Sequence, residues 1–232
     1  MPAWFQDIPL TVVEICPRCG KPQELCVCEA LAPFETRTQI LILRHPQEQD
    51  RELGTASLLA VQVQNATLKT GLSWPNLAKL LGRPADPKRW GVLYLGTQKS
   101  AAGRLDRVLT VVDRKGEALP RQDELLGALE GVILLDGNWQ QAKALWWRNA
   151  WMLKCRRLVL SPPRPSHYGN LRKEPRRESV STIEAAGWTL AELEGDDTLM
   201  TRLLPPFHLL LQKVRARNAA TKTAAGVKQG EA

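Results

Sequence analysis

The chain alternates between short apolar runs and segments in which apolar residues recur with helical spacing. Four apolar runs are long enough for strands and have too few polar positions for either face to be exposed: residues 38–44, 91–96, 132–136 and 156–161. Residues 66–74 alternate weakly, as a further strand would. Helical segments are predicted at residues 56–63, 75–82, 121–131, 138–152, 181–195 and 198–217. Because strands buried on both faces alternate with helices, the pattern predicts an α/β fold with a mostly parallel sheet flanked by helices.

The chain is expected to form one globular domain with short extensions. Its 232 residues, 44% of them hydrophobic, can bury one sizeable core. Residues 1–36 lack periodicity and contain a cysteine cluster, so we predict a small N-terminal appendage there. The main domain is predicted at 37–218, with Pro205-Pro206 interrupting its last helix. Residues 219–232 are expected to be a disordered tail.

The charge of the chain favours a polyanionic partner. Its 32 Lys and Arg residues against 24 Asp and Glu residues give a formal net charge of +8. A basic excess of this kind suits RNA or DNA better than anionic lipid, although a solvated basic surface is the alternative interpretation. The basic residues gather at Arg156-Arg157, Arg164, Arg172-Lys173, Arg176-Arg177, 213–217 and Lys222. No apolar run approaches 18 residues and no signal-peptide pattern opens the chain, so we expect a cytoplasmic protein without a membrane partner.

Four of the five cysteines form a compact cluster with the spacing of a metal site. Cys16, Cys19, Cys26 and Cys28 supply four thiolates within thirteen residues, and the intervening Gly and Pro suit tight turns. Four soft ligands favour tetrahedral Zn²⁺ with no open position, which predicts a structural site. A redox pair or an iron–sulfur cluster is the alternative. Cys155 stands apart and is expected to be a small buried residue.

Polar segments follow the predicted strands and should meet at one edge of the sheet. They are "RHPQE", "GTQKS", "DGNW" and "SPPRPSHY", and parallel sheets bind ligands beyond the carboxyl ends of their strands. Asp136 stands between a buried strand and a helix, where it is either a ligand-facing carboxylate or, like Asn138, a helix cap. Trp139 stands on the first turn of the helix predicted at 138–152. It either contacts a ligand, by lining a pocket or stacking on a base, or packs in the core with the apolar helix face that includes Trp146.

Two further segments carry candidate ligand contacts. Gly54-Thr55-Ala56 would let backbone approach a ligand after a loop with His45, Glu48 and Arg51. Ser181-Thr182-x-Glu184 opens a helix as a capping motif does. The proline-containing segment "SPPRPSHYGNLRKEPRRESVSTIEA" at residues 161–185 is called the basic loop and is interpreted as an RNA-phosphate clamp, with a flexible solvated loop as the alternative. Its candidate RNA contacts are Arg164, Tyr168, Arg172, Arg176 and Arg177.

Five segments in order resemble one known family. They are "CPRCGKPQELCVC", "RHPQEQDRELGTA", "LDGNWQQAK", "SHYGNLRKEP" and "STIEA". Together they resemble the DTW-domain family of tRNA-uridine aminocarboxypropyltransferases over about residues 14–211. The family motif is Asp-x-Thr-Trp, and this chain has Asn138 where Thr is usual. Asn retains the ability to cap a helix and to form hydrogen bonds, so the resemblance predicts that the site is preserved.

The resemblance implies a fold, a reaction and a set of contacts. The fold would be SPOUT-like, with a C-terminal crossing that is knotted in that class. The donor would be S-adenosyl-L-methionine, and its 3-amino-3-carboxypropyl group would pass to N3 of a uridine in RNA, with tRNA favoured and no DNA partner expected. Asp136 and Trp139 would be catalytic. The donor would lie against Gly54, Thr55, Leu135, Gly137, Asn138, Thr182 and Glu184. A SPOUT-like RNA methyltransferase and a non-catalytic zinc-bearing RNA-binding module are the alternatives.

Overall fold

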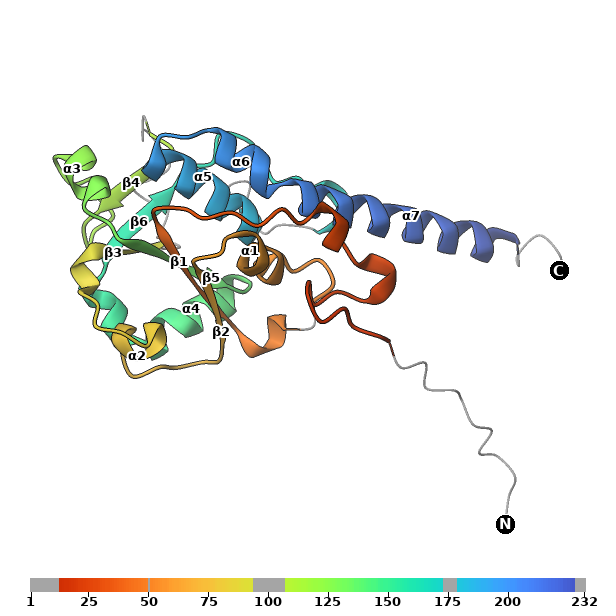
Figure 1. The fold of residues 1–232 in the computed structure, drawn as a ribbon, viewed down its shortest axis with the longest axis horizontal. Coiled ribbons are helices and arrows are strands. Elements are labelled where there is room, and N and C mark those ends of the chain that lie inside the picture. Colours follow the sequence, from red (N-terminus) through yellow and green to blue (C-terminus); the bar gives the residue numbers. More distant parts are fainter. Residues whose placement is uncertain (1–12, 50, 94–106, 173–178, 228–232) are drawn as a thin grey trace, which may run out of the picture.

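The computed structural model describes residues 13–49, 51–93, 107–172 and 179–227. A six-stranded sheet runs through the middle of the molecule in the order β2-β1-β5-β3-β6-β4 (Figure 1). Five of the strands are parallel, and β4 runs antiparallel to β6. The strands are β1 (Gln39–Arg44), β2 (Ala66–Thr70), β3 (Trp90–Leu93), β4 (Leu109–Val112), β5 (Gly131–Asp136) and β6 (Arg156–Leu160). The predicted mostly parallel α/β sheet is confirmed.

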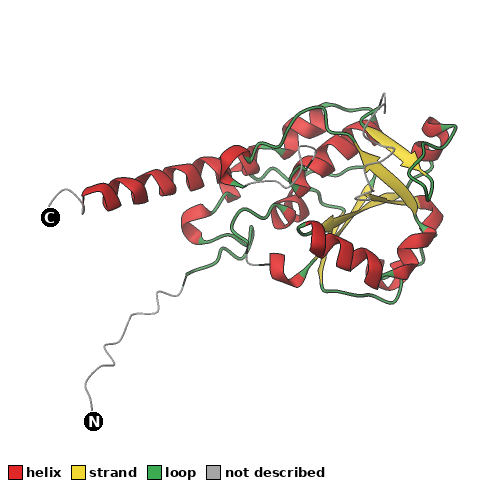
Figure 2. Ribbon diagram, turned by 180° about the vertical axis from the view of Figure 1, so that it is seen from behind, coloured by secondary structure: helices red, strands yellow, loops and turns green. Residues whose placement is uncertain are grey.

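Helices cover both faces of the sheet (Figure 2). The α-helices are α1 (Ala56–Gln62), α2 (Leu77–Leu81), α3 (Gln122–Gly127), α4 (Trp139–Arg148), α5 (Thr182–Glu194), α6 (Thr198–Leu203) and α7 (Pro205–Val227). Short 3-10 helices are η1 (Gln23–Leu25), η2 (Cys28–Ala30), η3 (Pro46–Glu48), η4 (Pro87–Arg89), η5 (Ala150–Lys154) and η6 (Gly169–Leu171). One face packs Ile40, Ile42, Val132 and Leu134 against α1, α5, α6 and α7. The other packs Leu41, Leu43 and Ile133 against α2, α4 and η5.

Several predicted boundaries shift because turns interrupt the periodic pattern. The helix predicted at 121–131 ends at Gly127, since the chain must turn before β5 begins at Gly131. The helix predicted at 138–152 ends at Arg148 and continues as η5. The predicted strand at 91–96 is described only as far as Leu93, and "GTQKS" lies outside the described residues. The four-residue β4 was not predicted at all.

The N-terminal segment shares the core of the sheet. Cys16, Cys19, Leu25 and Val27 are buried in the same apolar cluster as β1, β5, α5 and α7. Figure 1 shows this segment beside α7, whose blue ribbon extends away from the sheet. The region predicted as an appendage therefore packs against the main domain from at least residue 16 onwards.

The C-terminal helix is longer than the sequence predicts. Helix α7 continues to Val227, so the chain is helical over most of the segment where a disordered tail was expected from residue 219. Among the helices that the structure describes, none is long and apolar enough to cross a membrane.

Candidate active site

Asp136 occupies the last position of β5, at the centre of the carboxyl edge of the sheet. Its backbone oxygen accepts a hydrogen bond from the His45 N–H at 2.9 Å, which ties the ends of β5 and β1 together. Its side chain is 7% exposed. The cap of α4 is Asn138, whose side chain accepts from the Gln141 N–H while the Gln141 side chain accepts from the Asn138 N–H. Because Asn138 caps the helix, capping does not explain the carboxylate of Asp136.

The Asp136 carboxylate meets the N-terminus of a second helix. Thr182, the first residue of α5, donates its hydroxyl to Asp136 Oδ1 at 2.6 Å. Burial raises the pKa of Asp136 above its ordinary value, and the nearby Glu48 carboxylate raises it too. The Thr182 hydrogen bond, Arg44 and Arg172 act in the opposite direction. A buried carboxylate with a raised pKa is a stronger proton acceptor than an exposed one.

The loop after β1 forms one wall beside this carboxylate. In η3, Gln47 accepts a hydrogen bond from the buried Gln141 of α4 at 3.2 Å. Glu48 is 6% exposed and lies 3.8 Å from the Arg51 guanidinium. The polar segments after β1 and β5 therefore meet, as the parallel sheet predicts.

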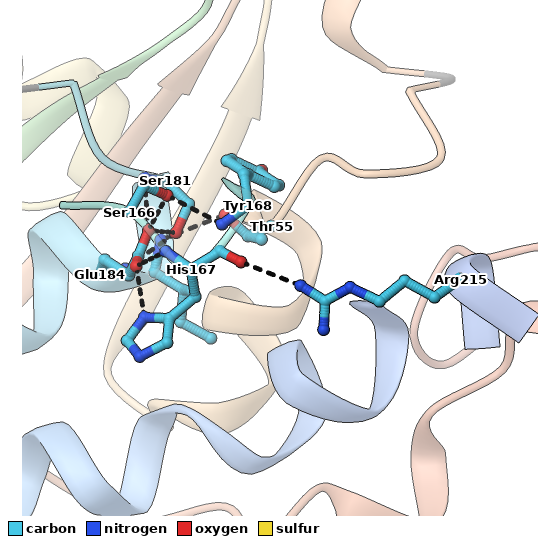
Figure 3. Close-up of polar contacts among 8 residues, drawn as sticks. Thr55, Ser166, His167, Tyr168, Ser181, Glu184 and Arg215 are labelled. Carbon is cyan, nitrogen blue, oxygen red and sulfur yellow. Dashed lines mark hydrogen bonds and ion pairs between the residues drawn. The ribbon is translucent and has the colours of Figure 1, made fainter. Parts of the chain in front are cut away.

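Glu184 holds residues 166 and 167 of the basic loop against the start of α5. It is 1% exposed, and Figure 3 shows it surrounded by the side chains of two serines and a histidine. Its oxygens accept from the Ser181 N–H and hydroxyl at 2.8 and 2.6 Å, and from the Ser166 hydroxyl at 2.7 Å. They also lie 2.8 Å from the His167 N–H and 2.7 Å from His167 Nδ1. Burial alone would raise the pKa of Glu184, but these hydrogen bonds outweigh it and hold the pKa below the usual range.

The backbone oxygens of residues 51–54 are held by donors from two distant segments. Lys21, from the cysteine cluster, donates to Arg51 O at 3.2 Å, to Glu52 O at 2.7 Å and to Gly54 O. Tyr168, from the basic loop, donates its hydroxyl to Leu53 O at 2.6 Å. Lys21 is 2% exposed, and this burial lowers the pKa of its ammonium group to about 8. We call residues 51–54 the clamped loop.

The four clustered cysteines have the geometry of a tetrahedral metal site. All four Sγ atoms lie within 4.8 Å of one another. Cys16 and Cys28 are 3.5 Å apart, and Cys19 and Cys26 are 3.8 Å apart. These separations exceed the ~2.05 Å of a disulfide and approach the edge of about 3.8 Å that four Zn–S bonds of ~2.3 Å define. The group therefore fits a zinc ion.

The residues predicted to contact the donor differ in how far they are exposed to solvent. Leu135, Gly137 and Thr182 are partly buried, and Asn138 is exposed. Gly54 belongs to the clamped loop, while Thr55 is 1% exposed and its hydroxyl oxygen accepts from the Ile183 N–H at 3.2 Å. Thr55 and Glu184 thus hold neighbouring segments in place beside Asp136. A Cβ at Gly137 would lie 2.8 Å from the Gln141 Cβ, so glycine is required there. Trp139 is partly buried on the first turn of α4.

The predicted RNA contacts separate into exposed, buried and undescribed residues. Arg164 is exposed and Arg172 is partly buried. Tyr168 is 1% exposed, with its ring edge-on to Phe207 at 5.0 Å and the Arg172 guanidinium 5.4 Å from its centroid. Because its ring is buried in the hydrophobic core, it cannot make the predicted RNA contact. Arg176 and Arg177 lie outside the described residues.

Sequence reasoning missed Lys21, Ser166 and His167. Lys21 looked like one more surface lysine in the cysteine cluster, and no local pattern could show that its partners lie some thirty residues away. Ser166 and His167 stand in the segment "SHYGN", which was the available signal, but their hydrogen-bond partner Glu184 follows 18 and 17 residues later, respectively.

The fold and site define an α/β domain with a buried carboxylate at the carboxyl edge of its sheet and a four-cysteine cluster packed beside it. The family model of the DTW domain matches residues 13–215, so the chain belongs to the DTW-domain family. No solved structure matches the chain significantly.

Curated relatives carry the name tRNA-uridine aminocarboxypropyltransferase 2. The chain is 26% identical to the protein of Macaca fascicularis over 200 residues, and 28% identical to those of Mus musculus over 202 residues and Drosophila melanogaster over 205 residues. Each match covers 84% of this chain and, respectively, 61%, 61% and 72% of the relative. The chain therefore spans less than two thirds of the length of the two mammalian proteins.

Proposed function

We propose that this protein transfers the 3-amino-3-carboxypropyl group of S-adenosyl-L-methionine to N3 of a uridine in tRNA. The observation that carries the proposal is the buried Asp136 carboxylate at the carboxyl edge of the sheet, in a DTW domain whose relatives are named tRNA-uridine aminocarboxypropyltransferases. A helix cap already exists at Asn138, so a carboxylate that costs free energy to bury there calls for a chemical role.

The chemistry requires one proton transfer and one substitution at carbon. The uridine N3–H bond breaks, and the Asp136 carboxylate accepts that proton. N3 then forms a bond to the donor carbon, and the C–S bond breaks with its electron pair going to sulfur, so methylthioadenosine leaves as a neutral thioether. Three carbons are bonded to the sulfonium sulfur, and the one held in line with N3 is transferred. The pocket therefore selects between aminocarboxypropyl and methyl transfer.

The residues around Asp136 would position both substrates. Trp139 would form a wall of the uridine pocket from the first turn of α4. Gly54, Leu135, Gly137 and Asn138 would present the backbone and side chains that contact the donor. Thr182 holds Asp136 by a hydrogen bond, while Thr55 and Glu184 fix α5 and the basic loop. The arrangement would be SPOUT-like, and the support for this is the parallel sheet with α5 returning to the end of β5; the knotted crossing is part of the proposal.

The four-cysteine cluster would hold Zn²⁺ in a structural role. With four thiolates, the ion would have no open position for substrate, so its contribution would be to order residues 16–28. No step of the transfer requires it.

Product analysis separates the proposal from a methyltransferase. Purified protein incubated with total tRNA and S-adenosyl-L-methionine should release methylthioadenosine and yield an aminocarboxypropyl-uridine nucleoside, both measured by mass spectrometry. Release of S-adenosylhomocysteine with a methylated nucleoside would show methyl transfer instead. RNA binding without donor binding would identify a non-catalytic RNA-binding module.

The basic loop is expected to bind RNA phosphate. Replacing Arg172, Arg176 and Arg177 with Ala should weaken tRNA binding and reduce the slope of log K against log salt by about 0.7–0.9 for each phosphate that is no longer bound. Donor affinity should change little. The measurement is a salt titration of tRNA affinity for the triple variant and the wild type, and equal slopes would assign these arginines to a solvated surface.

A further inference from the structure

A second basic surface lies at the edge of the sheet opposite Asp136. A pocket of about 400 Å³ is lined there by Lys88, Arg114, Lys154, Arg156 and Arg157, together with Val112, Asp113, Leu119, Leu153 and Cys155. The lining thus contains five cationic side chains and one carboxylate, that of Asp113. We call these ten residues the basic pocket.

Strand directions place the basic pocket at the amino ends of the parallel strands. Lys88 belongs to η4, which directly precedes β3. Lys154 ends η5 and Arg156 begins β6. Because β4 is antiparallel to β6, its last residue Val112 pairs with Arg157, and this brings Arg114 to the same edge. Asp136 ends β5, so the pocket and the candidate active site lie at opposite edges of the sheet.

Several contacts hold the pocket in shape. Arg157 donates to Arg114 O at 3.3 Å, and its guanidinium lies 5.4 Å from the centroid of the Trp146 ring. The carboxylate of Asp113 accepts from the Lys115 and Glu117 N–H groups at 2.7 and 2.9 Å, so it braces the turn after β4. Arg114 and Lys154 are exposed, and Arg156 and Arg157 are partly buried. Cations that come from separate segments and line one concave surface form a site for phosphate groups.

We infer that the basic pocket binds the phosphate backbone of the RNA substrate at a distance from the modified nucleotide. This inference rests on the proposed function and extends it. The six residues of β5 at ~3.3 Å each, and two strand spacings of ~4.8 Å, put the pocket on the order of 20 Å from Asp136. Duplex nucleic acid covers that distance in roughly six base pairs at ~3.4 Å each. A structured RNA of tRNA size can therefore contact both edges together, which favours it over a short single strand.

Charge reversal at two exposed positions tests the inference. Arg114→Glu with Lys154→Glu leaves β6 and the Trp146 contact unchanged, because Arg156 and Arg157 remain. The matched control is Lys69→Glu with Lys79→Glu, an equal charge change at two exposed lysines of β2 and α2 that do not line the basic pocket. Binding of total tRNA is measured from 50 to 200 mM salt, with S-adenosyl-L-methionine binding and thermal stability measured on the same preparations.

The pocket variant should show a salt slope smaller by about 1.4–1.8, as expected for two phosphate contacts at 0.7–0.9 each. Its KM for tRNA should rise while kcat at saturating tRNA and donor affinity remain those of the wild type. The control should keep the wild-type slope. Equal slopes for the pocket variant and the wild type, or an equally reduced slope in the control, would overturn the inference. A wild-type protein that binds tRNA but transfers nothing would contradict the proposed function, and a reduced slope in the pocket variant alone would still support the pocket's RNA contact.

Discussion

Asp136→Asn is expected to lower single-turnover transfer by at least ~100-fold, because a positioned general base contributes about 10²–10⁴-fold in rate. The substitution keeps the side chain's size and leaves an oxygen that can accept the Thr182 hydroxyl. Asn138 caps α4 in either case, so the melting temperature and metal content should stay close to wild type. The measurement is transfer to tRNA under single-turnover conditions, with thermal unfolding on the same preparation.

The pH dependence of the transfer rate distinguishes loss of the general base from a structural change in the site. Because burial raises the pKa of Asp136, wild-type transfer should fall as the pH drops through a value above the ~4 of an ordinary aspartate. The Asn variant should lack that acid limb. Thr182→Val is the matched control: it keeps the carboxylate but removes a hydrogen bond that lowers its pKa, so the limb should move to higher pH. Near-wild-type transfer by a well-folded Asn variant would refute the catalytic role.

The fold was predictable because its main elements are locally encoded. The apolar runs of β1 and β5 and the capping residues of α5 stand in the sequence in the order in which they act. Parallel strands place their carboxyl ends at one edge, so the neighbourhood of Asp136 and His45 followed from the fold class alone. The short β4 was not predicted, although it is as long as β3, so its length alone does not explain the miss.

The contacts that hold the site together were beyond sequence reasoning because their partners are distant along the chain. Glu184 was correctly predicted as half of a capping box, but local spacing cannot show that Ser166 and His167 also donate to it. Tyr168 stands among arginines, which suggested an RNA contact. Its ring instead packs on Phe207 of α7, a helix that begins 37 residues later. The positions of Ser166, His167 and Tyr168 therefore depend on tertiary packing, which local composition does not predict.

The cysteine cluster offers the strongest case of such a long-range link. The sequence predicts an appendage over residues 1–36, whereas Lys21 connects the cluster to three carbonyls of the clamped loop. Gly54 closes that loop and Thr55, the next residue, accepts from the backbone of α5 at Ile183. A change in the cluster should therefore reach the proposed donor contacts through Lys21.

Lys21→Met is accordingly expected to weaken S-adenosyl-L-methionine binding about tenfold, a change equivalent to ~1.4 kcal/mol. Methionine preserves the length and apolar stem of the side chain but leaves buried carbonyls without their charged donor, which should also lower the free energy of unfolding by about 1–3 kcal/mol. Donor affinity is measured by calorimetry at a temperature well below the melting transition of the variant.

The matched control is Lys213→Met, because Lys213 also contacts the cluster, donating to Cys26 O at 2.5 Å, but makes no bond to the clamped loop. It should keep wild-type donor affinity. Cys16→Ser, which removes one ligand of the proposed zinc site, should weaken donor binding as Lys21→Met does, because loss of the proposed ion would release the turn that positions Lys21. If Lys21→Met and Cys16→Ser both bound the donor as tightly as wild type, the cluster would act as the independent appendage that the sequence predicts. If only the two variants that reach the clamped loop lost affinity, the zinc site would be part of the framework that holds the donor.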